Sequence, residues 1–121
     1  MPSATPPILA PCGSRPNCVS SHSLDAGHRV EPLAFSGPAE VAEKRLKRAI
    51  ATLPRTRVVA ERPGYLHVEC RSWLFRFVDD LELVIGAGRI EVRSAARTGY
   101  SDMGVNRRRV ERLRAAFVAV E

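Results

Sequence analysis

The sequence contains no apolar run that approaches the roughly 20 residues of a membrane-spanning helix. Its beginning, M-P-S-A-T-P-P-I-L-A-P-C, lacks the basic region and the apolar segment of a secretory signal peptide. Cysteine is scarce as well, and an odd count of three would leave one thiol unpaired in an oxidising compartment. Together these absences predict a cytoplasmic protein.

Aromatic residues are few: one Trp, two Tyr and four Phe, most of them at positions expected in the core. Proteins that bind single-stranded nucleic acid stack the bases on exposed aromatic rings. The sequence also has no helix-turn-helix or zinc-finger pattern. Nucleic acid is therefore disfavoured as a partner.

The 121 residues are enough for one domain of ordinary size, and 45% hydrophobic and 26% charged residues are typical of a soluble globular protein. The formal charge of +6 is unevenly distributed. Residues 1–35 hold two arginines and two acids, so the excess lies in residues 36–121. A basic domain favours anionic partners: a small anion, a lipid headgroup or an acidic protein.

Residues 1–35 contain six of the nine prolines and are interpreted as an irregular N-terminal arm preceding a single domain over 36–121. The arm carries Cys12, Cys18, His22 and His28, which together could form a metal site. Zinc sites space paired cysteines by about two to four residues, whereas five intervene here. The spacing argues against a metal. It leaves two alternatives open, a loop laid over the core and a labile disulfide.

Periodicity predicts a helix capped by Ser36, with an apolar stripe from Ala42 to Leu53, and ended by Pro54. A second helix is predicted from Arg107 to about Val120. Between them the period changes to two, which indicates two hairpins. Thr56–Arg62 and Tyr65–Arg71 flank the turn Pro63-Gly64, and Leu74–Ile85 and Arg89–Arg97 flank residues 86–88.

The predicted fold class is therefore α+β, with the order α-β-β-β-β-α: an antiparallel four-stranded sheet carrying both helices on one face. The register of the second hairpin is open. A two-residue loop sets Asp80 opposite Arg93 and Glu82 opposite Glu91, whereas a four-residue loop sets Glu82 opposite Arg93 and avoids the repulsion.

Three polar residues of this hairpin are expected to have structural roles: Asp79, Asp80 and Ser94. Alternation directs Asp79 and Ser94 toward the core. A buried carboxylate is costly unless it is paired, so Asp79 should be held by an arginine or by backbone N–H groups of the 97–104 loop.

The segment from Arg93 to Arg112 is unusually dense in directional polar groups. Asn106 is interpreted as the N-cap of the last helix. Arginines in the first helical turn face the positive end of the helix dipole, so Asp102, Glu111 or a bound anion should offset them. Asp102 is expected to fold back onto this turn and to neutralise part of the Arg107–Arg109 cluster, with Gly99 and Gly104 supplying the backbone freedom. If the helix begins near the sheet face that carries Arg93 and Arg97, they could converge with Arg109 on one anion. If both helices cover the opposite face, the two strand arginines remain exposed and solvated. The candidate ligand-binding residues are Arg93, Arg97, Ser101, Asp102, Asn106, Arg107 and Arg109.

The function favoured by these residues is a non-catalytic module that binds an anionic ligand or partner, because arginine forks suit phosphate and carboxylate. One alternative is a hydrolase with Asp79, Asp80 and Asp102 as acids or bases. Its nucleophile elbow is incomplete, because Met103 stands where G-x-S-x-G requires glycine. The other alternative is a purely structural domain. No catalytic residue, metal site or cofactor is assigned.

The segments P-N-C-V-S-S, R-S-W-L-F-R-F-V-D-D-L-E and R-S-A-A-R-T-G-Y-S-D-M-G-V-N-R-R-R resemble the domain-of-unknown-function family numbered 1499, found in bacteria and plant plastids. The resemblance runs from Cys12 to Phe117 and implies no activity, substrate or cofactor. Many relatives carry a signal or anchor before the arm, so the resemblance implies an envelope or membrane association as the alternative to the cytoplasm. The family's pattern emphasises Ser72, Asp79, Asp80, Arg93, Ser94, Arg97, Gly99, Ser101, Asp102, Asn106 and Arg109.

Overall fold

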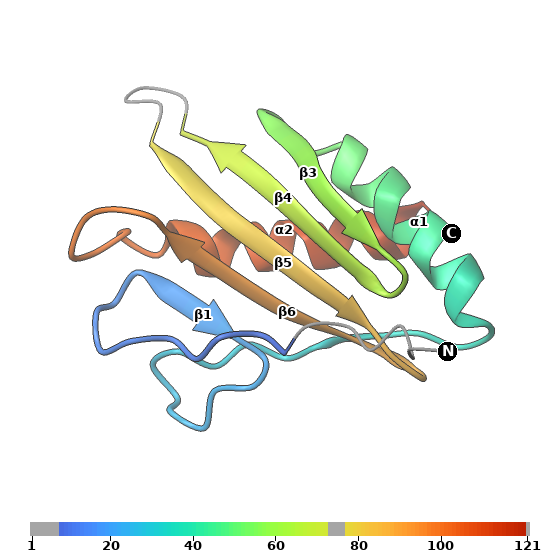
Figure 1. Ribbon diagram of the computed structural model, residues 1–121, viewed down its shortest axis with the longest axis horizontal. Coiled ribbons are helices and arrows are strands. Elements are labelled where there is room, and N and C mark those ends of the chain that lie inside the picture. Colours follow the sequence, from blue (N-terminus) through green and yellow to red (C-terminus); the bar gives the residue numbers. More distant parts are fainter. Residues whose placement is uncertain (1–7, 73–76, 121) are drawn as a thin grey trace.

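The computed structural model describes residues 8–72 and 77–120. In chain order the elements are β1 (Cys18–Ser20), β2 (Leu33–Ala34), α1 (Ala39–Ala51), β3 (Thr56–Arg62), β4 (Tyr65–Arg71), β5 (Val78–Ile85), β6 (Arg89–Ala96) and α2 (Val105–Ala119). The strands form one antiparallel sheet in the order β1-β6-β5-β4-β3, and β2 also pairs with β6. Figure 1 shows the helices on one side of this sheet, with α2 passing behind the long strands. The fold is α+β.

The prediction of four strands in the order α-β-β-β-β-α was wrong, because two short strands of the N-terminal arm precede α1 and extend the sheet beyond β6. All three residues of β1 are buried and β2 has only two residues. Neither segment is long enough to display the alternation by which strands are recognised in a sequence. The arm also supplies Val19, Val30 and Leu33 to the core.

Both predicted hairpins are present. The β3–β4 pair spans the predicted residues on either side of Pro63-Gly64. In the β5–β6 pair, Ile85 lies opposite Ile90 and Glu82 opposite Arg93, so the four-residue connection is the one adopted. This register keeps Glu82 away from Glu91 and agrees with the electrostatic argument for the longer loop. The predicted start of this hairpin at residues 74–76 lies outside the described residues.

The outer edge of the sheet is β3, which carries a bulge. Its register with β4 shifts between Val58 and Ala60, so Val59 is the additional residue. Both Val58 and Val59 are about two-fifths exposed, at 41% and 36%. A bulge of this kind increases the local twist of an edge strand.

The apolar core lies between the sheet and the two helices. From α1 it receives Ala42, Leu46, Ala49 and Ile50, as the periodicity predicts. The helix itself begins at Ala39 after an N-cap at Pro38 that makes no side-chain hydrogen bond, so the assignment of Ser36 as the cap was wrong. Proline has no N–H to satisfy and a fixed φ, which suits a helix start. Neither described helix has the length and apolarity needed to cross a bilayer.

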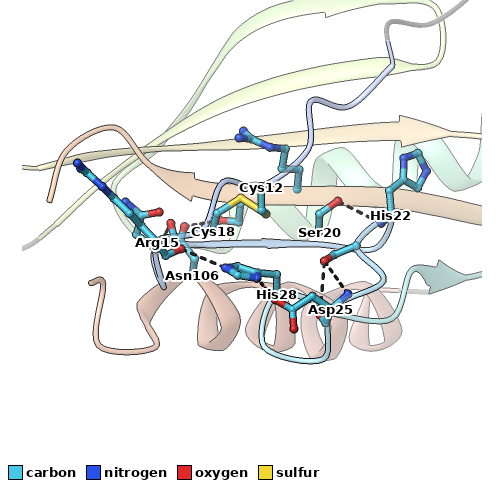
Figure 2. The surroundings of a disulfide bond; sticks show 12 residues. Cys12, Arg15, Cys18, Ser20, His22, Asp25, His28 and Asn106 are labelled. Carbon is cyan, nitrogen blue, oxygen red and sulfur yellow. Dashed lines mark hydrogen bonds and ion pairs between the residues drawn. A yellow bond between two sulfur atoms is a disulfide. The ribbon is translucent and has the colours of Figure 1, made fainter. Parts of the chain in front are cut away.

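Figure 2 shows the disulfide between Cys12 and Cys18, whose Cα atoms lie 5.6 Å apart. Of the two alternatives left open by the spacing, the structure adopts the disulfide. Cys70 is the remaining cysteine, and it is buried and free. The odd cysteine count therefore gives no argument for a reducing compartment, because two cysteines pair and the third is enclosed.

The two histidines of the arm do not approach the cysteines as ligands. His28 Nδ1 lies 2.6 Å from Asp25 and its Nε2 lies 3.1 Å from the Arg15 carbonyl, while His22 lies 3.4 Å from Glu91. The hydrogen bond with Asp25 raises the pKa of His28 above its ordinary value. Within residues 8–72 and 77–120, no group of three His, Cys, Asp or Glu side chains is placed to hold a metal ion.

Candidate functional site

The structure separates the strand arginines from the arginines of the last helix. Arg93 and Arg97 lie on the sheet face opposite the helices, where each meets carboxylates. Arg97 donates to both oxygens of Asp80 at 2.8 Å and to Glu69 at 2.7 Å. These hydrogen bonds lower the pKa of Asp80 and raise that of Arg97. Of the two arrangements left open by the sequence, the structure adopts the one in which the helices cover the opposite face, so Arg93 and Arg97 do not meet Arg109. The two strand arginines are paired with carboxylates and not simply solvated.

Arg93 occupies the same outer face. One of its terminal nitrogens lies 3.6 Å from Glu82, which also accepts a 2.6 Å hydrogen bond from Tyr65. His67 approaches Asp80 at 2.7 Å. Arg97 is therefore closely paired with acids, whereas Arg93 has only the more distant Glu82 and its buried Nε has no hydrogen-bond partner among the described residues.

On the helix side, Asp79 and Arg109 form a buried ion pair. Asp79 is 8% exposed, and its Oδ2 lies 2.8 Å from Nη1 of Arg109. Burial raises the pKa of the Asp79 carboxyl, and the neighbouring guanidinium offsets only part of that effect. The prediction that Asp79 faces the core and is held by an arginine is confirmed.

Asn106 connects this ion pair to the sheet and to the preceding loop. It is fully buried, and its Oδ1 accepts from Ser94 Oγ at 2.6 Å and from Arg109 Nη1 at 2.7 Å. Its Nδ2 donates to Asp102 at 2.8 Å and more distantly, at 3.5 Å, to the Asn17 carbonyl. Asp79, Ser94, Asp102, Asn106 and Arg109 therefore form one hydrogen-bonded unit, called here the buried polar cluster.

The start of α2 differs from the prediction. Gly104, not Asn106, is the N-cap, and its φ of 81° lies in the left-handed region. Asp102 provides the capping oxygens, accepting from the backbone N–H of Gly104 at 2.8 Å and of Asn106 at 3.1 Å. Burial would raise the pKa of Asp102, but these hydrogen bonds and that of the Asn106 side chain lower it overall. The glycine predicted to give the backbone freedom for this reversal, Gly104, is therefore itself the N-cap.

The expectation that Asp102 folds back onto the first helical turn is confirmed, but its partners are backbone and amide groups and not the arginines. Arg107 turns away and donates to the carbonyls of Arg29 at 2.8 Å and Gly27 at 3.1 Å. Ser101 is exposed, and its hydroxyl accepts from the Met103 N–H at 3.2 Å. Of the seven candidate ligand residues, the buried polar cluster unites Asp102, Asn106 and Arg109.

A cleft of about 310 Å³ opens beside this cluster, between the α1–β3 connection, the end of β4 and the first turns of α2. Its polar walls are dominated by guanidinium groups, and none of the described residues that line it is acidic. The arginines are Arg55, Arg71, Arg108, Arg109 and Arg112. Only Arg109 belongs to the set predicted from the sequence.

These five arginines differ in how far they are neutralised. Arg109 is paired with Asp79, and Arg71 lies 3.7 Å from Glu69. Arg108 and Arg112 are exposed, four residues apart on α2, and have no carboxylate partner among the described residues. Two guanidiniums at this spacing share one helix face.

Arg55 completes the cleft from the opposite side. Its φ of 56° is unusual for a residue with a side chain, and its Nε donates to the Arg71 carbonyl at 3.1 Å. The backbone N–H of Arg71 in turn donates to the Arg55 carbonyl at 3.0 Å. This reciprocal pairing fixes Arg55 beside β4, and no carboxylate within the described residues neutralises it. This approach follows from the β3–β4 hairpin, because Arg55 and Arg71 lie at the same end of the strand pair although they are sixteen positions apart in the chain.

Cys70 also lines the cleft but is poorly suited to nucleophilic chemistry. Burial raises the pKa of its thiol to about 11. We expect the native protein at neutral pH to react with a thiol reagent such as a disulfide dye roughly 100-fold more slowly than the denatured chain, because the thiolate is the reacting species. In denaturant without reductant, one thiol per chain should react with the reagent. Rapid labelling of the native state, or more than one thiol after denaturation, would contradict the burial of Cys70 or the pairing of Cys12 with Cys18.

Comparison with models of known protein families identifies the family to which this chain belongs. The model of a protein family described as "Protein of unknown function (DUF1499)" matches residues 8–117. The chain belongs to this family. The match includes the disulfide-bonded arm, the whole sheet and nearly all of α2, so both the buried polar cluster and the cleft lie within the DUF1499 region. No curated protein matches the sequence. The DUF1499 description names no activity, and function must be argued from the site itself.

Proposed function

We propose that this DUF1499 chain is a non-catalytic module that binds an anionic ligand in the arginine-lined cleft. The observation that carries the proposal is the concentration of five arginines around one cleft, with no acid among the described lining residues. Guanidinium groups form charge-assisted, often bidentate hydrogen bonds with phosphate and carboxylate groups. Like charges gathered without local compensation repel one another, and an anion would relieve that repulsion.

The buried polar cluster supports the proposal by fixing one wall of the cleft. Arg109 is held by Asp79 from the sheet and by Asn106 from its own helix, so its position costs little further ordering when a ligand binds. Arg55 is held through the Arg71 carbonyl. Arg108 and Arg112 remain available for direct contact.

The lining groups also favour binding over catalysis. General acid–base catalysis needs a group that exchanges a proton near the working pH. The described titratable side chains around the cleft are five guanidiniums, which stay protonated, and the Cys70 thiol, whose pKa is raised to about 11. Asp80 lies on the other face of the sheet, and Asp79 and Asp102 are engaged inside the buried polar cluster.

The test is isothermal titration of the purified protein with inorganic phosphate, pyrophosphate, phenyl phosphate and citrate. The expected result is saturable binding of at least one anion that persists at about 0.15 M salt, where weak attraction to a general basic surface is screened. An Arg108→Ala, Arg112→Ala variant should lose at least about tenfold in affinity, equivalent to about 1.4 kcal/mol.

The matched control is Arg93→Ala, Arg97→Ala, which removes the same charge from the opposite face of the sheet. It should bind nearly as the unmodified protein does. The absence of saturable binding for all four anions would overturn the proposal. Loss of binding in the Arg93, Arg97 variant alone would move the site to the outer face of the sheet.

A further inference from the structure

The cleft has an apolar part as well as a charged one. Leu53 and Cys70 are buried at 7% and 2% exposure, and Val105 is 38% exposed at the first position of α2. All three line the cleft together with Pro54. Leu53 and Cys70 are already enclosed, so the apolar surface open to water is that of Pro54 and Val105. A hydrated inorganic ion would leave this surface in contact with water, whereas a ligand that carries an apolar group would cover it.

The number of arginines around the cleft that lack a carboxylate partner indicates how many negative charges the ligand carries. Two of the five arginines have carboxylates nearby, Asp79 for Arg109 and the more distant Glu69 for Arg71. Arg55, Arg108 and Arg112 have none within the described residues, which leaves three positive charges around one cleft. A monoanion would compensate only one of them, so the balance favours a ligand with at least two negative charges.

From these two observations we propose that the ligand is a phosphomonoester, or a dianion of the same shape, attached to a small apolar group. This inference rests on the proposed anion-binding function and narrows it to a class of compound. The dianionic head would lie among Arg108, Arg112 and Arg55, and the apolar group would pack against the exposed side chains of Pro54 and Val105. A volume of about 310 Å³ is at the lower end of the range of roughly 300–1,000 Å³ found for small-molecule sites. A ligand of this size is larger than inorganic phosphate and smaller than a dinucleotide.

Three probes separate the contributions of charge and apolar surface: phenyl phosphate, benzenesulfonate and inorganic phosphate. At about pH 8 phenyl phosphate is a dianion, because its second pKa lies near 6. Benzenesulfonate keeps the ring and the tetrahedral head but has one charge, and inorganic phosphate keeps the charge without the ring. Phenyl phosphate should bind about tenfold more tightly than either of the others.

Two variants test the placement of the ligand. Val105→Ala is a small change at an exposed helix position. It should lower the affinity for phenyl phosphate about threefold and leave the affinity for inorganic phosphate unchanged. The Arg108→Ala, Arg112→Ala variant should bind phenyl phosphate and inorganic phosphate more weakly by the same factor. Circular dichroism melts of each variant establish that it is folded before binding is compared.

The source of the phosphomonoester is distinguished with vesicles. Co-sedimentation with phosphatidylcholine vesicles containing phosphatidic acid, but not with vesicles containing phosphatidylglycerol, would identify a membrane lipid as the source. Binding of phenyl phosphate without co-sedimentation would identify a free compound. Either result supports the proposed class.

The outcomes that overturn the inference differ from those that overturn the proposed function. Equal affinity for phenyl phosphate and benzenesulfonate would refute the dianion, and equal affinity for phenyl phosphate and inorganic phosphate would refute the apolar group. In both cases the module still binds anions. Failure of every anion to bind would refute the proposed function itself.

Discussion

Replacing Asp79 with alanine should lower the free energy of unfolding by about 3 kcal/mol, as expected when one partner of a buried ion pair is removed. The side chain of Arg109 is only 14% exposed, and its Nη1 shares Asp79 and Asn106. Without the carboxylate, a desolvated guanidinium would remain with a single neutral amide as its principal partner. Urea denaturation followed by circular dichroism measures the difference directly.

The control for this experiment is Asp80→Ala on the neighbouring residue of β5. Asp80 pairs with Arg97 on the outer face, where the arginine side chain is 44% exposed. Removing an exposed ion pair should cost no more than about 1 kcal/mol. A loss below about 0.5 kcal/mol for Asp79→Ala would mean that the carboxylate of Asp79 is hydrated and does not stabilise α2.

Removing the disulfide should have the second largest effect, about 2 kcal/mol for a Cys12→Ser, Cys18→Ser variant. The bond closes a short loop with a sequence separation of six, so the gain from restricting the unfolded chain is at the low end of that for disulfides. Denaturation of the variant and of the unmodified protein, with and without a dithiol reductant, measures the cost. Reductant should destabilise the unmodified protein and leave the variant unchanged.

The loss of stability should be concentrated in the 97–104 loop, because residues inside the disulfide ring form hydrogen bonds with that loop. The Asn17 side chain donates to the Gly99 carbonyl at 2.7 Å, and the Pro16 carbonyl accepts from the Asp102 N–H at 3.2 Å. Hydrogen exchange should therefore accelerate at Asp102 and at Ala96, whose N–H donates to the Asn17 carbonyl. Unchanged exchange at both amides would show that the ring does not support the loop. Cys70→Ser serves as the control for loss of a thiol alone.

Much of the fold follows from local patterns in the sequence. The turn at Pro63-Gly64 and the alternation of Tyr65–Arg71 predict the bounds of both strands of the β3–β4 hairpin to the residue, because a period of two identifies a strand buried on one face. The bulge at Val59, which shifts the register, was not predicted. Alternation along β5 likewise predicts that the side chain of Asp79 enters the core and therefore needs a cationic partner. Long elements of regular period are predicted well, since each residue adds to the same signal.

The parts of the fold and of the site that the sequence did not predict depend on contacts between residues far apart in the chain. The strands β1 and β2 are defined by hydrogen bonds to β6 and not by a periodic pattern of their own. The cleft joins Arg55, Arg71 and Arg108, which come from three separate segments. Their approach depends on where β3 and β4 end and how α2 crosses the sheet. The density of polar groups predicted a site within residues 93–112, but it could not tell which arginines share a face of the sheet with which carboxylates.

The bulge in β3 has a consequence for solubility. No strand within the described residues pairs with the outer edge of β3, so its unpaired N–H and C=O groups could align with a strand of another molecule. The additional residue Val59 breaks the regular spacing of those groups, and Arg57, Glu61 and Arg62 place charges along the same short edge. A twisted, charged edge is a poor template for the flat pairing that begins aggregation. The bulge and the charges along this edge therefore disfavour extension of the sheet through β3.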